Sequence, residues 1–146
     1  MNHVEVARVF SHPLERVFRR YTDHAGWSEW AGMGGVRLVK EGAPERDGVG
    51  AVRVFSLAPT GLREEVTLFD PPTRMEYRIS EGGFPLAEHR GEVLFTPQGT
   101  ATRVTWRISF ASRIPGTGKL LALGLGALFR GALTRLGRDL DRHHPG

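Results

Sequence analysis

Residues 36–112 alternate apolar and polar side chains, and no other feature of the chain constrains its fold as strongly. The alternation is clearest at its end, where one face carries Val104, Trp106, Ile108 and Phe110 and the other carries Arg103, Thr105, Arg107 and Ser109. Earlier runs share the pattern: Val36/Leu38, Val52/Val54, Leu62/Glu64/Val66/Leu68 and Met75/Tyr77/Ile79. Turn-forming residues separate these runs at 70–72, 81–83 and 97–99. The stretch therefore predicts six or seven antiparallel strands with a single apolar face.

One long helical pattern follows the alternating region. After a break at 114–116, with Thr117 as the expected N-cap, apolar residues recur at the spacing of a helix face: Leu121, Leu125, Leu128, Phe129, Ala132, Leu136 and Leu140. An apolar sheet face and an apolar helix stripe must cover each other, which predicts a two-layer α+β domain.

The first 35 residues predict a strand followed by short helices. Val4, Val6 and Phe10 alternate with polar residues, and Ser11 and Pro13 then signal a helix start. Asp23 is the expected cap of a second short helical piece, which carries Trp27 and Trp30 and ends at the glycines of 32–35.

Length and composition limit what the chain can do. With 146 residues, we expect a single domain over 1–146. The absence of cysteine excludes disulfides, thiolate zinc sites and a cysteine nucleophile. Glu5 and Arg8 interrupt any signal peptide, and the longest charge-free apolar run, 120–129, is shorter than the ~20 residues of a membrane span. These features predict a cytoplasmic protein without a transmembrane helix.

The positive net charge of +4 is confined to one segment. Residues 1–112 hold 14 basic and 14 acidic side chains, whereas residues 113–146 hold six basic and two acidic ones. The first half of the long helix is apolar nearly all round, because Leu120 and Leu123 fall opposite the core stripe. We therefore expect a peripheral contact of this helix with an anionic membrane, a covering by nearby loops, or a homodimer.

Three motifs, in this order and spacing, resemble a known superfamily. They are residues 11–18 (SHPLERVF) with Thr22, Asp23, Trp27 and Trp30; residues 63–67 (REEVT) leading into 70–72 (DPP); and residues 102–106 (TRVTW). The chain resembles the START, pollen-allergen and polyketide-cyclase (SRPBCC) superfamily, and within it the bacterial polyketide cyclase/dehydrase and lipid-transport branch. The resemblance implies a helix-grip fold, in which a curved seven-stranded antiparallel sheet wraps around a long C-terminal helix and encloses an apolar cavity, with two short helices after the first strand. It also implies that Trp30 lies near the cavity mouth.

Four polar residues have the parity of core positions, and in such a cavity they would face a ligand: Glu64, Tyr77, His89 and Trp106. Apolar residues expected to line the cavity with them and with Trp30 are Val54, Val66, Val93, Ile108, Leu121, Leu125 and Phe129. The parity of His89 depends on a turn-like stretch at 82–85 and could slip by one residue. Ordinary core packing of Tyr77 and Trp106 is the competing interpretation.

These residues leave three functions open. The first is binding, with or without transport, of a hydrophobic or aromatic small molecule. The second is a cofactor-independent enzyme of the cyclase or dehydratase kind, in which Glu64 or His89 abstracts a proton and Tyr77 steadies the enolate. The third is an interaction module that acts through the C-terminal helix. We expect no metal, because the histidines lack ligand spacing, no cofactor, and no nucleic-acid partner.

Overall fold

A computed structural model describes residues 1–56 and 61–145 of the chain. Its elements are β1 (Asn2–Phe10), α1 (Leu14–Thr22), the 3-10 turn η1 (His24–Gly26), α2 (Trp27–Trp30), β2 (Val36–Lys40), β3 (Val52–Phe55), β4 (Leu62–Asp70), β5 (Arg74–Glu81), β6 (Leu86–Gln98), β7 (Ala101–Ser112) and α3 (Gly118–His143).

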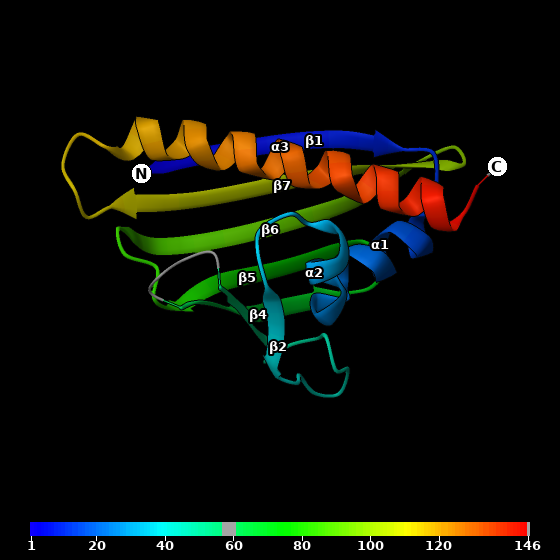
Figure 1. Ribbon diagram of the computed structural model, residues 1–146, viewed down its shortest axis with the longest axis horizontal. Helices are drawn as coiled ribbons and strands as arrows, with labels where there is room; N and C mark the ends of the chain where they lie inside the picture. The colour runs from blue at the N-terminus through cyan, green and yellow to red at the C-terminus, as the bar shows by residue number, and fades with distance from the viewer. Residues whose placement is uncertain (57–60, 146) are drawn as a thin grey trace.

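The seven strands form one curved antiparallel sheet in the order β1-β7-β6-β5-β4-β3-β2. The long helix α3 lies along β1 and β7 (Figure 1). The short helices α1 and α2 cover the concave face near the C-terminal half of α3. The expected helix-grip architecture is confirmed, because a single apolar sheet face curves around a single long helix.

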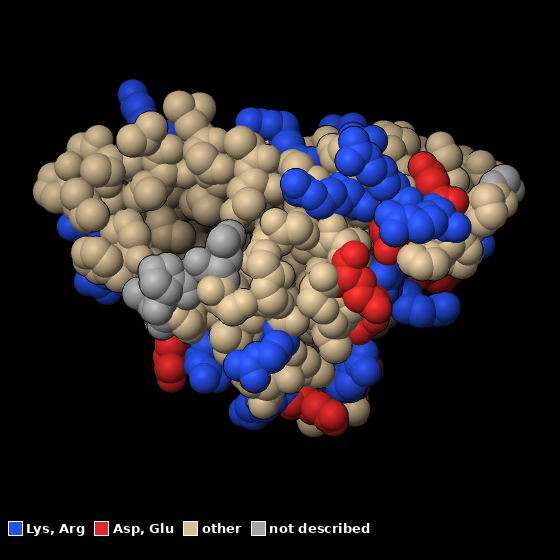
Figure 2. Space-filling view, in the orientation of Figure 1, with Lys and Arg blue, Asp and Glu red and all other residues tan. Residues whose placement is uncertain are grey.

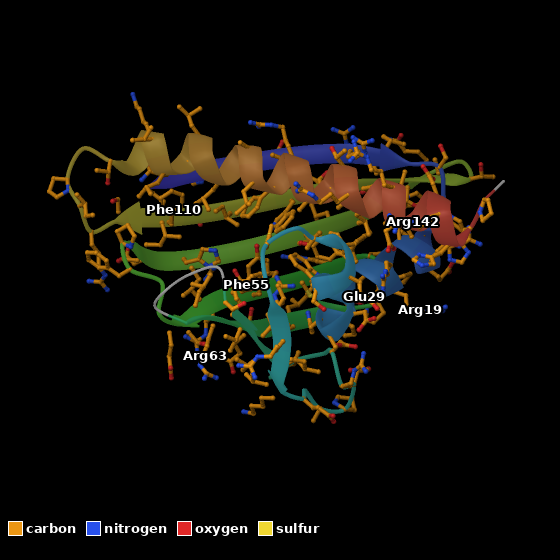
Figure 3. The ribbon with its side chains drawn as sticks, viewed as in Figure 1. Arg19, Glu29, Phe55, Arg63, Phe110 and Arg142 are labelled. Atoms are coloured by element: carbon orange, nitrogen blue, oxygen red, sulfur yellow. The ribbon has the colours of Figure 1, made fainter. Side chains whose placement is uncertain are left out.

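The concave face carries the core, as the alternation predicts. In β7, residues Val104, Trp106, Ile108 and Phe110 are buried. Val4 and Val6 of β1 belong to the same core cluster. Phe55 and Phe110 belong to the buried core, whereas Arg63 is partly exposed and pairs with Glu81 (labelled residues in Figure 3).

Two strands depart from the expected parity. In β3, Arg53 and Phe55 face inward, so Val54 lies on the opposite face of the sheet and is not part of the core cluster. In β4, a register shift between Val66 and Leu68 turns Leu68 outward and brings Phe69 into contact with the core. A bulge changes which residues of a strand face inward, and a strict period of two cannot show where one occurs.

The caps of the helices also differ in part from expectation. Asp23 accepts a hydrogen bond from the Gly26 amide at 3.3 Å, as a cap should. Ser11 does not cap α1, since Pro13 holds the N-cap position. Thr117 is the N-cap residue of α3, but its hydroxyl donates to the Ile114 carbonyl instead of accepting from a helix amide.

The two halves of α3 differ in burial. From Phe129 to Leu140 its stripe is buried against the sheet, whereas Leu120 and Leu123 are 72% and 71% exposed. Contrary to the sequence expectation, α3 is by length and composition apolar enough to cross a membrane. Its second half nevertheless packs on this chain's own sheet, as a core helix does.

Candidate functional site

A cavity of about 260 Å³ lies between the sheet and the first half of α3. Its wall consists of Trp27, Met33, Phe55, Leu62, Glu64, Ile79, Leu86, His89, Trp106, Ile108, Leu125, Leu128 and Phe129. Figure 2 shows a hollow in the uncharged part of the surface beneath this half of the helix.

A buried ion pair lies at one side of the cavity, with Glu64 in the wall and Arg53 beside it. Arg53 and Glu64 stand opposite each other in the β3–β4 register, which places both side chains on the concave face. The guanidinium donates through Nε and Nη2 to the same carboxylate oxygen, Glu64 Oε1, at 3.0 and 2.8 Å. Among the described residues, no hydrogen bond reaches the second oxygen, Oε2. Glu64 therefore presents a free acceptor to the cavity.

Aromatic rings and a histidine hold Arg53 in place. Its guanidinium lies 4.2 Å from the ring centre of Trp27 and 5.1 Å from that of Tyr77. Burial alone would lower the pKa of Arg53, but the charge and hydrogen bonds of Glu64, together with Tyr21 and Tyr77, outweigh this effect and raise it. The Nη1 group lies 3.4 Å from His24 Nδ1. Because arginine can only donate, Nδ1 must accept, and the Nε2–H of His24 donates to the Asp47 carbonyl at 2.9 Å.

His89 faces the cavity from the other side of β5. Its Nδ1 accepts a hydrogen bond from the Ile79 amide at 3.1 Å, which leaves the proton of the neutral ring on Nε2. Burial lowers the pKa of His89, and the charge of Arg53 contributes to the shift against the opposing effect of Glu64. The imidazole is therefore neutral at pH 7. Within the described part of the chain, Nε2 has no hydrogen-bond partner, so it offers one free donor.

Trp106 and Tyr77 share one hydrogen bond, in which the tyrosine oxygen is the acceptor. Trp106 Nε1 donates to Tyr77 Oη at 2.7 Å, and Trp106 stacks on Phe129 with ring centres 4.0 Å apart. Burial raises the pKa of Tyr77 well beyond its ordinary value, and the charge of Glu64 adds to this effect. The tyrosine ring lies over Gly91, where a Cβ would come within 2.3 Å of Tyr77 Cζ. Only glycine leaves room for this ring.

Six of the residues expected to face a ligand line the cavity: Glu64, His89, Trp106, Ile108, Leu125 and Phe129. Tyr77, Val66 and Val93 are buried beside it without lining it, and Leu121 packs half-buried on the core. Trp30 is buried away from the wall, and its Nε1 has no partner among the described residues. Trp27 lines the cavity instead. The prediction that Val54 lines the cavity is wrong, because Arg53 and Phe55 occupy the inward positions of β3.

Sequence reasoning missed Arg53 and several apolar wall residues. Arg53 stands between two valines, so its charge indicates an outward position, and only the pairing of β3 with β4 shows that Glu64 is its partner. Leu86 and His89 both line the cavity despite opposite parity, because a register shift between Ala87 and Arg90 separates them. The positive φ of Glu88, 52°, marks this bulge.

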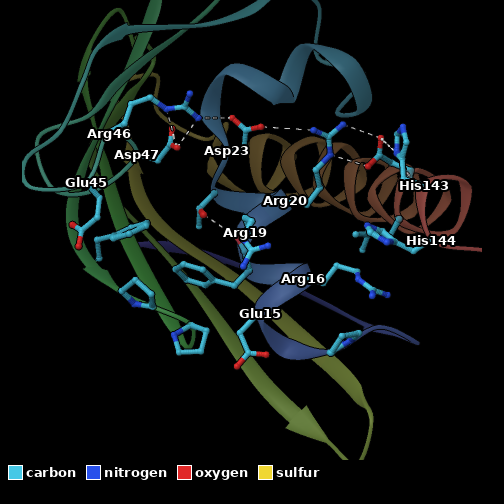
Figure 4. A pocket seen from close by; sticks show the side chains of 18 of the residues that line it. Glu15, Arg16, Arg19, Arg20, Asp23, Glu45, Arg46, Asp47, His143 and His144 are labelled. Atoms are coloured by element: carbon cyan, nitrogen blue, oxygen red, sulfur yellow. Dashed lines mark hydrogen bonds and ion pairs between the residues drawn. The ribbon is translucent and has the colours of Figure 1, made fainter.

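A larger depression, of about 1050 Å³, lies outside the sheet between α1, the segment after β2 and the end of α3. Figure 4 shows that ion pairs cross it: Arg20 with Asp139 and Asp23, and Arg46 with Asp23 and Asp47. Two of the four arginines that line this groove, Arg20 and Arg46, are paired in this way, whereas Arg16 and Arg19 form no ion pair with a described carboxylate. The described residues contain no group of three or more His, Asp or Glu side chains placed to hold a metal ion.

Comparisons with known proteins agree with the fold. A family model described as polyketide cyclase/dehydrase and lipid transport matches residues 1–141. No curated protein sequence matches the chain.

Similar solved structures include a protein from Thermobifida fusca, with 23% identity and a TM-score of 0.78 over 99% of this chain and 96% of that chain. XoxI from Bacillus cereus has 17% identity and a TM-score of 0.76 over 99% of each chain. BexL, a di-domain ARO/CYC from the BE-7585A biosynthetic pathway, has 16% identity and a TM-score of 0.76 over 97% of this chain and 47% of that chain. At these identities the likeness shows the fold alone.

Proposed function

The chain belongs to the polyketide cyclase/dehydrase and lipid transport family, and from this membership and its cavity we propose that it binds a small hydrophobic or aromatic molecule between the sheet and α3. The observation that carries the proposal is an apolar cavity of about 260 Å³ with only a few polar atoms in its wall. Such a combination is typical of sites that bury a ligand and orient it through a few hydrogen bonds.

The size of the cavity restricts the ligand. At ~30 Å³ for each molecule of liquid water, the space equals about nine waters, so it suits a ligand on the order of ten non-hydrogen atoms. A diacyl lipid is far larger. The four aromatic rings of the wall, from Trp27, Phe55, Trp106 and Phe129, favour a ring compound through edge and face contacts.

A pair of matched substitutions on α3 tests the proposal. Leu125→Trp should fill the cavity, whereas Leu123→Trp adds the same ring two residues away on the solvent side. We expect naphthylamine, a small uncharged fluorophore at pH 7, to bind the unchanged protein and Leu123→Trp, and to bind Leu125→Trp at least tenfold more weakly. Equal affinity in both variants, with both shown to be folded by circular dichroism, would contradict binding in this cavity.

A second candidate function is proton transfer of the cyclase or dehydratase kind. The observation in its favour is that a carboxylate oxygen and an imidazole N–H, those of Glu64 and His89, both face the cavity without other partners. The carboxylate could take a proton from a carbon next to a carbonyl, while the N–H of His89 stabilises the oxygen of the resulting enolate. Tyr77 does not line the cavity, and its Oη accepts from Trp106, so it is not assigned this task. The name of BexL supports this alternative by analogy.

Deuterium exchange distinguishes the enzyme from the binding protein. If the site catalyses proton transfer, the bicyclic ketone tetralone should exchange its α-hydrogens with deuterated water faster in the presence of the protein, as followed by NMR. Glu64→Gln should abolish the acceleration, and Glu65→Gln, on the neighbouring outward position, should leave it intact. Exchange at the uncatalysed rate with tetralone bound would reject the enzymatic function for such ketones.

A further inference from the structure

Glu64 and His89 form a pair of complementary hydrogen-bonding groups on the cavity wall. Glu64 stands opposite Ile79 in the β4–β5 register, and the amide of the same Ile79 donates to His89. The two side chains therefore flank one residue of β5, on strands two spacings or roughly 10 Å apart. Both project from the concave face, and both line the cavity.

Hydrogen bonds within the protein engage one atom of each group and leave the other atom free. Oε1 of Glu64 accepts both hydrogen bonds from Arg53, so Oε2 is the free oxygen. A carboxylate oxygen can only accept a hydrogen bond. Nδ1 of His89 accepts a hydrogen bond from the Ile79 amide, so Nε2 is the free nitrogen. Nε2 carries the proton of the neutral ring and can only donate. Glu64 is only 8% exposed, which makes an unanswered acceptor costly unless a ligand or water satisfies it.

The other polar side chains that line the cavity or hold Glu64 are already engaged. Trp106 Nε1 donates to Tyr77, and Trp27 Nε1 donates to the Tyr21 carbonyl at 2.6 Å. The guanidinium of Arg53 is used by Glu64 and His24. Among the described wall residues, the free side-chain groups are thus one acceptor and one donor.

We propose that the cavity selects uncharged ring compounds that carry a hydroxyl group for Glu64 Oε2 and a carbonyl or ether oxygen for the Nε2–H of His89. The inference rests on the proposed binding function and specifies its ligand class. A carboxylate ligand is excluded, because its charge would face Glu64 and the positive charge of Arg53 is already paired. A purely hydrocarbon ligand would leave both groups without partners.

A series of bicyclic compounds of nearly equal size tests this selectivity by isothermal titration calorimetry. Naphthalene has neither group, naphthol has only the hydroxyl, tetralone has only the carbonyl, and hydroxytetralone has both. Each correct group should tighten binding by about tenfold, as one hydrogen bond to a buried partner does. Naphthoate should bind at least tenfold more weakly than naphthol.

Two variants assign each preference to its residue. Glu64→Gln should reduce the advantage of naphthol over naphthalene, and His89→Phe should remove the advantage of tetralone over naphthalene. The matched controls Glu65→Gln and His143→Phe change the same residue types outside the cavity and should leave both ratios unchanged. Because the ligand series in the unchanged protein already tests the selectivity, the proposal does not depend on either variant folding.

The outcomes separate this inference from the function on which it rests. If naphthalene, naphthol, tetralone and naphthoate bind with similar affinity, the cavity is a binding site but the selectivity is wrong. If hydroxytetralone binds no tighter than naphthalene, the inference is likewise overturned. If none of the compounds binds, the proposed function fails, and the selectivity fails with it.

Discussion

At the scale of single residues, Arg53 and Glu64 are the least expected feature of the protein. A guanidinium that is 2% exposed is tolerated because Glu64, His24 and three aromatic rings surround it. Removing water from both charges offsets much of their attraction, so the pair contributes little net stability while each member depends strongly on the other.

Arg53→Met should lower the free energy of unfolding by about 3–5 kcal/mol, because it leaves a buried carboxylate without a partner. Combining it with Glu64→Leu should restore most of the loss, since no charge then remains. Urea unfolding of the two single variants and the double variant measures the coupling. As a control, Arg78→Met breaks the exposed pair with Glu65 and should cost less than about 1 kcal/mol. A double variant as unstable as Arg53→Met would contradict this account.

At the scale of elements, the two halves of α3 differ in what they contact. Its second half belongs to the core, whereas its first half covers the cavity with Leu125 and Leu128 and turns Leu120 and Leu123 to solvent. The first half also contains Gly124, where an added Cβ would meet nothing within 4 Å. Glycine at this position therefore lowers the helix stability without any packing reason.

Gly124→Ala should raise the free energy of unfolding by up to ~1 kcal/mol, the difference in helix propensity between the two residues. Gly118→Ala is the matched control at the start of the same helix: its Cβ would overlap the side-chain amide of Asn2, so crowding should cancel the gain. Thermal unfolding followed by circular dichroism gives both values. No stabilisation by Gly124→Ala would mean that the first half of α3 is not a stable helix in solution.

At the scale of the whole molecule, the buried His24 and the half-buried His89 link stability to pH. Burial, with the nearby charge of Arg53, lowers the pKa of His24 to about 3, and burial also lowers the pKa of His89. Both rings are neutral when folded, whereas in the unfolded chain histidine takes up a proton near pH 6.5. The unfolded state therefore binds more protons below that pH, and the stability present above pH 6.5 is lost as the pH falls toward 3.

Between pH 7 and pH 5, His24 alone should cost about 2 kcal/mol of the unfolding free energy. His24→Gln, which retains hydrogen-bonding groups but cannot take up a proton in this range, should make the pH dependence shallower by that amount. His3→Gln, which changes an exposed histidine on β1, is the matched control. Urea unfolding at the two pH values measures the effect, and equal slopes for His24→Gln and the unchanged protein would refute it.

Contacts with a membrane or with a second copy of the chain also belong to this scale, and both stay predictions. The exposed Leu120 and Leu123 and the basic excess of residues 113–146 favour an anionic surface. Co-sedimentation with anionic vesicles at low salt tests the first contact, and sedimentation equilibrium tests the second.

The sequence by itself determined the architecture and six of the thirteen residues of the cavity wall. Alternation needs only the pleat of a strand, so the inward positions of β7 and the stripe of α3 follow from local geometry. His89 could be assigned to the concave face because the residues after it continue the same parity into Val93 and Phe95.

Only the tertiary structure decided the positions that depend on strand pairing. Bulges in β4 and β6 reverse the inward face along one strand, and they are stabilised by neighbouring strands rather than by the bulged residues alone. The burial of Arg53 depends on Glu64 in the next strand, and the free atoms of Glu64 and His89 depend on partners elsewhere in the fold. A charge can be buried where a partner compensates it, and no local pattern of residues contains that partner.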